Sequence, residues 1–215
     1  MPVTTVVFDV GETLIDETRH WAAWADWMGV SQLTFFAALG IAVERRLHHR
    51  QAFQLVRPGY DLAAETAKRE ATGWRYGFEA GDFYPDARPC LDRLRARGFR
   101  VGLAGNQPEA AEAALRAAGI EADFIASSAG WGVEKPSPAF FAKVIAAAGR
   151  PAAEIAYVGD RLDNDVLPAK ACGMTAVFLR RGPWGLVHAD WPEAAEADLR
   201  LETLDGLADA LASAP

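Results

Sequence analysis

The stretch VVFDVGETLID, residues 6–16, predicts the first strand of the fold. An apolar run leads directly into Asp9, and the small and polar residues Gly-Glu-Thr follow soon after it. A short apolar run bounded in this way is typical of a buried strand. We therefore expect residues 4–10 to form a strand that carries the Asp9 carboxylate to the end of a sheet.

The chain beyond residue 85 alternates between helical patterns and short apolar runs. Ser137-Pro138, for example, is a typical N-cap and first-turn pair for a helix that runs to Gly149. Four further strands are predicted, at residues 100–104, 123–126, 155–158 and 175–179. Strands that alternate with helices favour a parallel sheet covered on both faces. The predicted fold class is therefore α/β with a parallel-sheet core.

The segment from residue 16 to residue 82 has a different character and contains no convincing strand. Its apolar residues recur at helical spacing, and Arg57-Pro58-Gly59 marks a turn between helices. We therefore predict a helical insertion after the first strand. Residues 1–15 and 83–215 would form the core, and residues 16–82 the insertion.

Composition narrows the possible partners. The 215 residues carry a formal net charge of −7, with 51% hydrophobic and 24% charged residues, which suits a packed core and a hydrated surface. No cluster of Lys and Arg suits a nucleic-acid backbone, and no apolar run approaches the roughly 18 residues of a membrane span. Cys90 and Cys172 lie far apart without a CxxC pattern. We expect a cytoplasmic protein with neither a nucleic-acid nor a membrane partner.

Polar residues follow several of the predicted strands. Asp9, Asn106 and Asp160 each come at or just after the end of a strand, and Lys135 lies in the loop between the third of these strands and a helix. Because the carboxyl ends of parallel strands meet at one edge of a sheet, we expect these side chains to lie close together. A small-molecule site is therefore predicted at this edge.

The acidic residues of this edge indicate a metal. Asp9, Asp160 and Asp165 would place three negative charges together, and Lys135 would balance only one. Such carboxylates raise one another's pKa or need a cation. Mg²⁺ held by carboxylate oxygens and a backbone carbonyl would relieve the repulsion. Asp9 would then attack phosphorus, with the metal and Lys135 neutralising the developing charge.

Four motifs in this order, FDVGETL, LAGN, GVEKPSP and VGDRLDND, resemble those of the haloacid dehalogenase superfamily across essentially the whole chain. The last two are the most specific. The resemblance implies a Rossmann-like core with a helical cap over the active site. It assigns Asp9 as the nucleophile, Lys135 as the charge-stabilising lysine, and Asp160 with Asp165 as the acidic pair that positions Mg²⁺. It also makes Asp9 and the backbone carbonyl of Gly11 metal ligands.

The chain departs from the family's phosphatase pattern at two places. The second aspartate, which protonates the leaving group, is replaced by Gly11, and Glu12 is expected to point elsewhere. The Ser or Thr that binds the transferring phosphoryl group is replaced by Gly105, which leaves Asn106 and backbone N–H groups as possible donors. Loss of a general acid removes a factor of roughly 10² to 10⁴, mainly for poor leaving groups.

The predicted cap offers further candidates for the site. Arg19 and His20 follow the first motif closely enough to face a bound substrate, and His20 is a possible proton donor. Lys68 is the only lysine of this segment, and its pattern favours a solvated position over Schiff-base chemistry.

Three classes of function follow from these motifs. The leading hypothesis is a Mg²⁺-dependent phosphatase of a small phosphorylated metabolite, acting through an aspartyl-phosphate. The alternative is a catalytically impaired homologue that binds a phosphorylated ligand or protein partner. Dehalogenation and phosphonate cleavage are less favoured, and the intact Asp160 and Asp165 count against dehalogenation.

Overall fold

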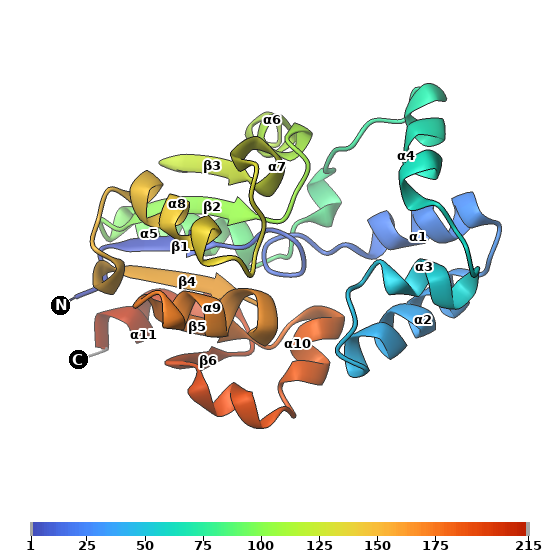
Figure 1. The fold of residues 1–215 in the computed structure, drawn as a ribbon. Coiled ribbons are helices and arrows are strands. Elements are labelled where there is room, and N and C mark those ends of the chain that lie inside the picture. Colours follow the sequence, from blue (N-terminus) through green and yellow to red (C-terminus); the bar gives the residue numbers. More distant parts are fainter. Residues whose placement is uncertain (1, 214–215) are drawn as a thin grey trace. The chain divides into compact units, whose positions relative to one another are not determined.

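The structure is a computed structural model that describes residues 2–213. Its sheet contains six strands: β1 (Thr5–Phe8), β2 (Arg100–Gly105), β3 (Phe124–Ser127), β4 (Ile155–Gly159), β5 (Thr175–Leu179) and β6 (Leu199–Leu201). All neighbouring strands pair in parallel, in the order β3-β2-β1-β4-β5-β6 (Figure 1). The predicted α/β fold class with a parallel-sheet core is confirmed.

The chain divides into two compact units. One contains the residues up to Asp16 and those from Gly77 onward, and the other is Glu17–Tyr76. Residues 77–82, which the sequence pattern placed in the helical segment, group with the sheet. The reason is local, because the Asp16 N–H donates to the Asp82 carbonyl at 2.7 Å and Phe78 packs against the core of the sheet.

Helices and turns connect the strands of the sheet unit (Figure 1). The helices are α5 (Ala87–Ala96), α6 (Ala110–Ala117), α7 (Ser128–Trp131), α8 (Pro138–Ala148), α9 (Leu167–Ala171), α10 (Gly182–His188) and α11 (Leu207–Ser213). A π-helical segment covers Leu162–Val166, and 3-10 turns cover Ala80–Asp82, Ala152–Glu154, Pro192–Glu196 and Leu204–Gly206. The predicted start of α8 is confirmed, because Ser137 caps the helix and Gly149 ends it at φ 63°.

Successive residues of β1 point to opposite faces of the sheet. Phe8 belongs to a cluster that contains Leu94 of α5 and Leu207 of α11. Val7 belongs to a second cluster with Phe140 and Phe141 of α8. Both clusters are almost fully buried, so the sheet is covered on both faces, and the polar end of each strand is left for the connecting loops.

Strand β6 and helix α10 are among the elements that were not predicted from the sequence. Strand β6 has only three residues, alternates Leu-Arg-Leu and pairs only with β5 at the edge of the sheet. Helix α10 begins with Gly182 and Pro183, which in the sequence are typical of a loop. Both are too short to show a hydrophobic periodicity in the sequence. Their structure depends on packing against the rest of the sheet.

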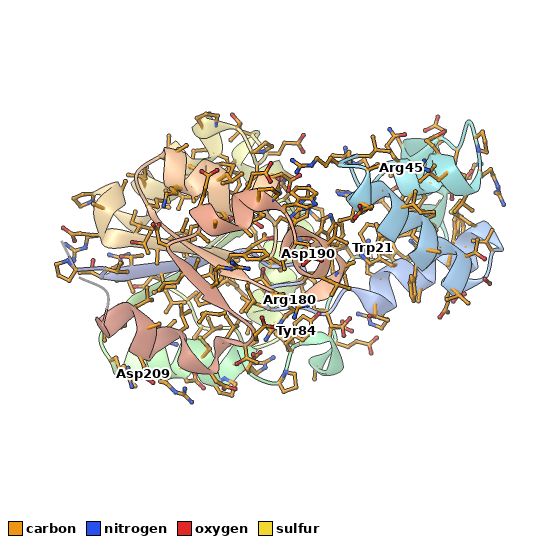
Figure 2. The ribbon with its side chains drawn as sticks, turned by 90° about the horizontal axis from the view of Figure 1, so that it is seen from below. Trp21, Arg45, Tyr84, Arg180, Asp190 and Asp209 are labelled. Carbon is orange, nitrogen blue, oxygen red and sulfur yellow. The ribbon has the colours of Figure 1, made fainter. Side chains whose placement is uncertain are left out.

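The helical unit contains the helices α1 (Thr18–Met28), α2 (Gln32–Glu44), α3 (Gln51–Val56) and α4 (Leu62–Ala71). Its core is aromatic: Trp21, labelled in Figure 2, stacks on Phe35 with 6.2 Å between ring centroids, and Trp24 meets Phe53 edge-on at 5.3 Å. Across the described chain no single helix is long and apolar enough to cross a membrane. Only α1 and α2 counted together, with a bend of 114°, reach that length and composition.

Candidate active site

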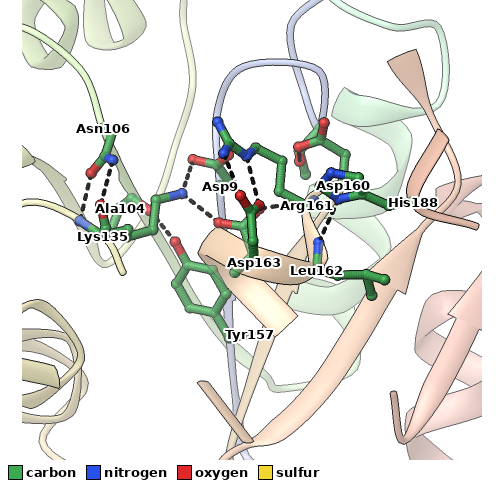
Figure 3. Close-up of polar contacts among 12 residues, drawn as sticks. Asp9, Ala104, Asn106, Lys135, Tyr157, Asp160, Arg161, Leu162, Asp163 and His188 are labelled. Atoms are coloured by element: carbon green, nitrogen blue, oxygen red, sulfur yellow. Dashed lines mark hydrogen bonds and ion pairs between the residues drawn. The ribbon is translucent and has the colours of Figure 1, made fainter. Parts of the chain in front are cut away.

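Lys135 lies between two of the predicted acidic residues. Its Nζ is 2.7 Å from Asp9 Oδ1 and 2.6 Å from Asp165 Oδ1 (Figure 3). Asp9 directly follows β1, and Asp160 directly follows the neighbouring strand β4. One carboxylate oxygen from each of Asp9, Asp160 and Asp165 lies within 4.8 Å of the others. The structure thus brings together the four charged residues that the sequence predicted for this edge.

The pKa values of these groups reflect burial and mutual repulsion. Burial opposes the charged form of Lys135, but Asp165 and Asp9 outweigh it and raise the pKa of the ammonium well above its usual value. Burial, together with the charges of Asp165 and Asp9, raises the pKa of Asp160. Burial also raises the pKa of Asp165 to about 6, although Lys135 opposes this shift. The repulsion among the three carboxylates is therefore only partly offset by the single positive charge of Lys135.

Asp160 has a free ligand atom. Its Oδ1 lies 3.5 Å from the Thr13 hydroxyl, whereas its buried Oδ2 has no hydrogen-bond partner among the described residues. An unpartnered buried carboxylate oxygen is costly unless a donor or cation meets it. Three convergent carboxylates are the oxygen donors that Mg²⁺ prefers. The residues at this edge therefore fit a hard divalent cation.

Asn106 positions the backbone of Lys135. Its Oδ1 accepts from the Lys135 N–H at 2.8 Å, and its Nδ2 donates to the Lys135 carbonyl at 3.0 Å (Figure 3). Tyr157 lies below the ammonium, with its ring centroid 5.6 Å from Nζ and its hydroxyl donating to the Ala104 carbonyl at 2.6 Å. The sequence predicted Asn106 as a substrate-binding residue, whereas its side-chain contacts hold the lysine. Tyr157 was missed, although a tyrosine in a buried strand was a usable signal.

The π-helical segment after β4 places Asp165. The Asp165 Oδ2 accepts from the Arg161 N–H at 3.1 Å, and the Leu162 N–H donates to His188 Nδ1 at 3.0 Å (Figure 3). His188 is 1% exposed and its ring lies 3.8 Å from that of Trp191. No sequence signal pointed to His188, because its role depends on α10 packing beside this segment.

Comparison with known proteins agrees with this geometry. The sequence model of the haloacid dehalogenase-like hydrolases matches residues 3–173. The chain belongs to this family.

Its curated relatives include phosphatases. A glyceraldehyde 3-phosphate phosphatase of Methanopyrus kandleri is 39% identical over 105 residues, which are 47% of this chain and 45% of that protein. A phosphoglycolate phosphatase of Pseudomonas fluorescens is 31% identical over 196 residues, which are 82% of this chain and 69% of that protein. The chain spans about half the length of several of these relatives, including the archaeal one.

Solved structures share the fold. The hydrolase YfnB from Bacillus subtilis, determined with bound magnesium, has a TM-score of 0.70 with 18% identity, over 98% of this chain and 99% of that one. At this identity the likeness concerns the fold. It agrees with a parallel-sheet hydrolase of the haloacid dehalogenase type.

Gly105 lies against the carboxylate of Asp9. A β-carbon at Gly105 would lie 2.4 Å from Asp9 Oδ1 and 3.5 Å from the Val10 backbone nitrogen. Real β-carbons essentially never lie as close as 2.4 Å to another heavy atom, so any larger residue at this position would move the Asp9 carboxylate. Gly105 therefore permits the position in which Asp9 meets Lys135.

The side chain of Glu12, the residue after Gly11, is bound to Tyr84. Glu12 is 4% exposed, has a φ of 52°, and accepts from the Tyr84 hydroxyl at 2.6 Å. A β-carbon at Gly182, where φ is 64°, would lie 2.3 Å from Glu12 Oε2. Arg181 covers the Tyr84 ring at 4.2 Å and donates to the Thr13 carbonyl at 2.9 Å. This network holds the loop that carries Gly11.

Arg19 and His20 belong to the helical unit, and their predicted role at the active site stays a prediction. Burial, followed by the charges of Arg69 and Arg19, lowers the pKa of His20 to about 4. The imidazole is therefore neutral near pH 7, and the charged imidazolium that would act as a general acid is not populated there. Lys68 is 65% exposed and pairs with Glu65 at 2.5 Å, as expected for a solvated side chain.

Proposed function

We propose that this hydrolase is a Mg²⁺-dependent phosphatase of small phosphorylated metabolites that reacts through an aspartyl-phosphate on Asp9. The observation that carries the proposal is the buried contact of Lys135 with Asp9 and Asp165, beside the unpartnered Oδ2 of Asp160. The phosphatase names of several relatives support the same reaction class.

Each residue has a distinct part in the proposed reaction. Lys135 holds Oδ1 of Asp9, so we assign the attack on phosphorus to Oδ2. The new Oδ2–P bond forms as the bond from phosphorus to the leaving oxygen breaks, and water later hydrolyses the acyl phosphate. Asp9, Asp160, Asp165 and the Gly11 carbonyl would hold Mg²⁺. When bound, the ion would neutralise charge on the transferring phosphoryl oxygens.

The leaving-group proton limits the range of good substrates. Gly11 has no side chain to donate a proton, and the Glu12 carboxylate already accepts from Tyr84. A general acid contributes roughly 10² to 10⁴ to the rate. We therefore propose that aryl and acyl phosphates, whose leaving groups depart without a proton, are turned over faster than unactivated alkyl phosphates.

The test is phosphate release from an aryl phosphate and an alkyl phosphate, with Mg²⁺ and with a chelator. Activity should require the metal and favour the aryl ester. Asp9→Asn should abolish it, whereas Asp92→Asn, an exposed carboxylate of α5, is the matched control and should leave it unchanged. Persistent turnover by the Asp9→Asn variant would overturn the proposal.

The second candidate is a binding protein for phosphorylated ligands without turnover, favoured by Gly11 and Gly105 in place of two side chains of the phosphatase pattern. The two candidates differ in the chemistry of Asp9. A fluoroberyllate adduct on Asp9 that requires Mg²⁺ would support the phosphatase. Binding of phosphate esters without turnover of any ester in a broad panel would support the second candidate.

A further inference from the structure

Arg161 is a cationic side chain beside the acidic cluster that the proposed reaction does not use. Its guanidinium contacts Asp163 as a fork: Nε is 3.1 Å from Oδ1 and Nη2 is 2.8 Å from Oδ2. The Arg161 side chain is 15% exposed, whereas that of Asp163 is 46% exposed. Trp184 lies behind the guanidinium, with its ring centroid 5.5 Å from Cζ. The arginine is therefore held in place by a carboxylate that itself faces water.

The backbone of Arg161 is part of the candidate active site. The residue directly follows Asp160, and its N–H donates to Asp165 Oδ2 at 3.1 Å. Figure 3 shows the side chain extending from this point to its contact with Asp163. The Arg161 charge also opposes the rise in the pKa of Asp160 and of Asp165, so the guanidinium lies beside the carboxylates that would meet the phosphoryl end of a substrate, where a second group of that substrate can contact it.

The fork geometry indicates which chemical group Arg161 is suited to bind. A guanidinium presents five N–H donors in one plane, and two parallel N–H bonds match the two oxygens of a carboxylate. The two oxygens of Asp163 already accept hydrogen bonds from Nε and Nη2 of Arg161 in this way. Because the Asp163 side chain is half exposed, its carboxylate regains water when another carboxylate takes its place, and the incoming carboxylate accepts the same two N–H bonds from the guanidinium.

We propose that Arg161 selects substrates that carry a carboxylate next to the phosphate ester, and that the substrate carboxylate displaces Asp163 from the guanidinium. Among unactivated alkyl phosphates, which the proposed reaction turns over more slowly than aryl phosphates, the favoured substrates are then phosphorylated hydroxy acids of short chain length. The inference rests on the proposed phosphatase function, because it concerns the second group of the same substrate.

The test compares phosphoglycolate with ethyl phosphate, two esters of similar size of which only the first carries a carboxylate. Arg161→Gln should lower kcat/KM for phosphoglycolate by roughly 10- to 100-fold, as expected for loss of hydrogen bonds to a charged group, and change that for ethyl phosphate less than threefold. Asp163→Asn should raise kcat/KM for phosphoglycolate alone, because the competing carboxylate is removed. Arg180→Gln, which breaks the exposed pair with Glu202, is the matched control.

A purely structural ion pair would give a different pattern. Arg161→Gln and Asp163→Asn would then reduce turnover of both esters equally and lower the melting temperature together, which would overturn the inference. Arg161→Lys keeps the charge without the fork, so a folded Arg161→Lys variant should still lose preference for phosphoglycolate. An unchanged preference in that variant would also overturn it.

A binding measurement separates this inference from the proposed function. The dissociation constants of phosphoglycolate and ethyl phosphate are measured by calorimetry in the Asp9→Asn background, with and without Arg161→Gln. A carboxylate preference that depends on Arg161 would support the inference even when wild-type protein hydrolyses neither these esters nor an aryl phosphate, a result that refutes only the phosphatase. Equal affinities for the two esters, with wild-type turnover present, would refute only the inference.

Discussion

A β-carbon placed on Gly105 would lie 2.4 Å from Oδ1 of Asp9, the oxygen that meets Lys135. The second motif of this chain therefore has a glycine where the Asp9 carboxylate needs the space. A serine or threonine at this place would supply a hydroxyl only if the Asp9 carboxylate moved away.

The first prediction follows from this contact. Gly105→Ala should lower kcat on an aryl phosphate by on the order of 10- to 100-fold, because a displaced nucleophile loses its alignment. Gly206→Ala, at an exposed glycine with open space around it, is the control and should leave kcat unchanged. Steady-state kinetics check both variants, and full activity of Gly105→Ala would show that Asp9 adopts another productive position.

The second prediction concerns Lys135 as a stabilising charge. Lys135→Met leaves Asp9 and Asp165 buried without their shared cation, and we expect the free energy of unfolding near pH 7 to fall by about 3 to 5 kcal/mol. Lys170→Met breaks the exposed pair with Asp198 and should cost less than about 1 kcal/mol. Denaturant unfolding without metal measures both, and equal small losses would contradict the assignment.

The third prediction is a pH-dependent effect of Mg²⁺. Burial raises the pKa of Asp165 from 3.8 to about 6. Because the folded-state pKa exceeds the unfolded value, the metal-free protein should lose stability as the pH rises from about 4 through 6. The proposed Mg²⁺ site consists of ionised carboxylates, so added Mg²⁺ should raise the melting temperature more near pH 7 than near pH 5. The shift should be roughly 5 to 10 °C at a hundredfold excess over Kd.

Differential scanning fluorimetry at the two pH values measures this effect. Asp160→Asn removes a proposed ligand and should abolish most of the Mg²⁺-dependent shift. An equal shift at both pH values would mean that the ion binds away from the carboxylate cluster.

The fourth prediction addresses the missing general acid. Gly11→Asp should raise kcat for an alkyl phosphate by roughly tenfold or more, within the range that a positioned acid contributes, and should affect an aryl phosphate much less. Gly206→Asp adds the same charge at an exposed place and should change neither. If Gly11→Asp gives no gain, the leaving group obtains its proton elsewhere.

The sequence could predict the elements whose signals are local. Ser137 and Gly149 mark the ends of α8 because capping and left-handed glycine conformations depend on neighbouring residues. Strand β6 and helix α10 carry no such signal, and their structure depends on packing against β5 and the segment after β4. Site residues differ in the same way. A sequence motif indicates Asp165, whereas the position of His188 beside Leu162 is seen only in the folded structure.

The sequence by itself determined that Asp9, Lys135, Asp160 and Asp165 belong to one edge of a parallel sheet, because strands that alternate with helices run parallel and their carboxyl ends then meet at the same edge. Only the tertiary structure decided what each side chain contacts there. In the folded chain Asn106 contacts the Lys135 backbone and Glu12 contacts Tyr84, residues that are far apart in the sequence. Such contacts join residues through side-chain packing, and no spacing along the chain encodes them.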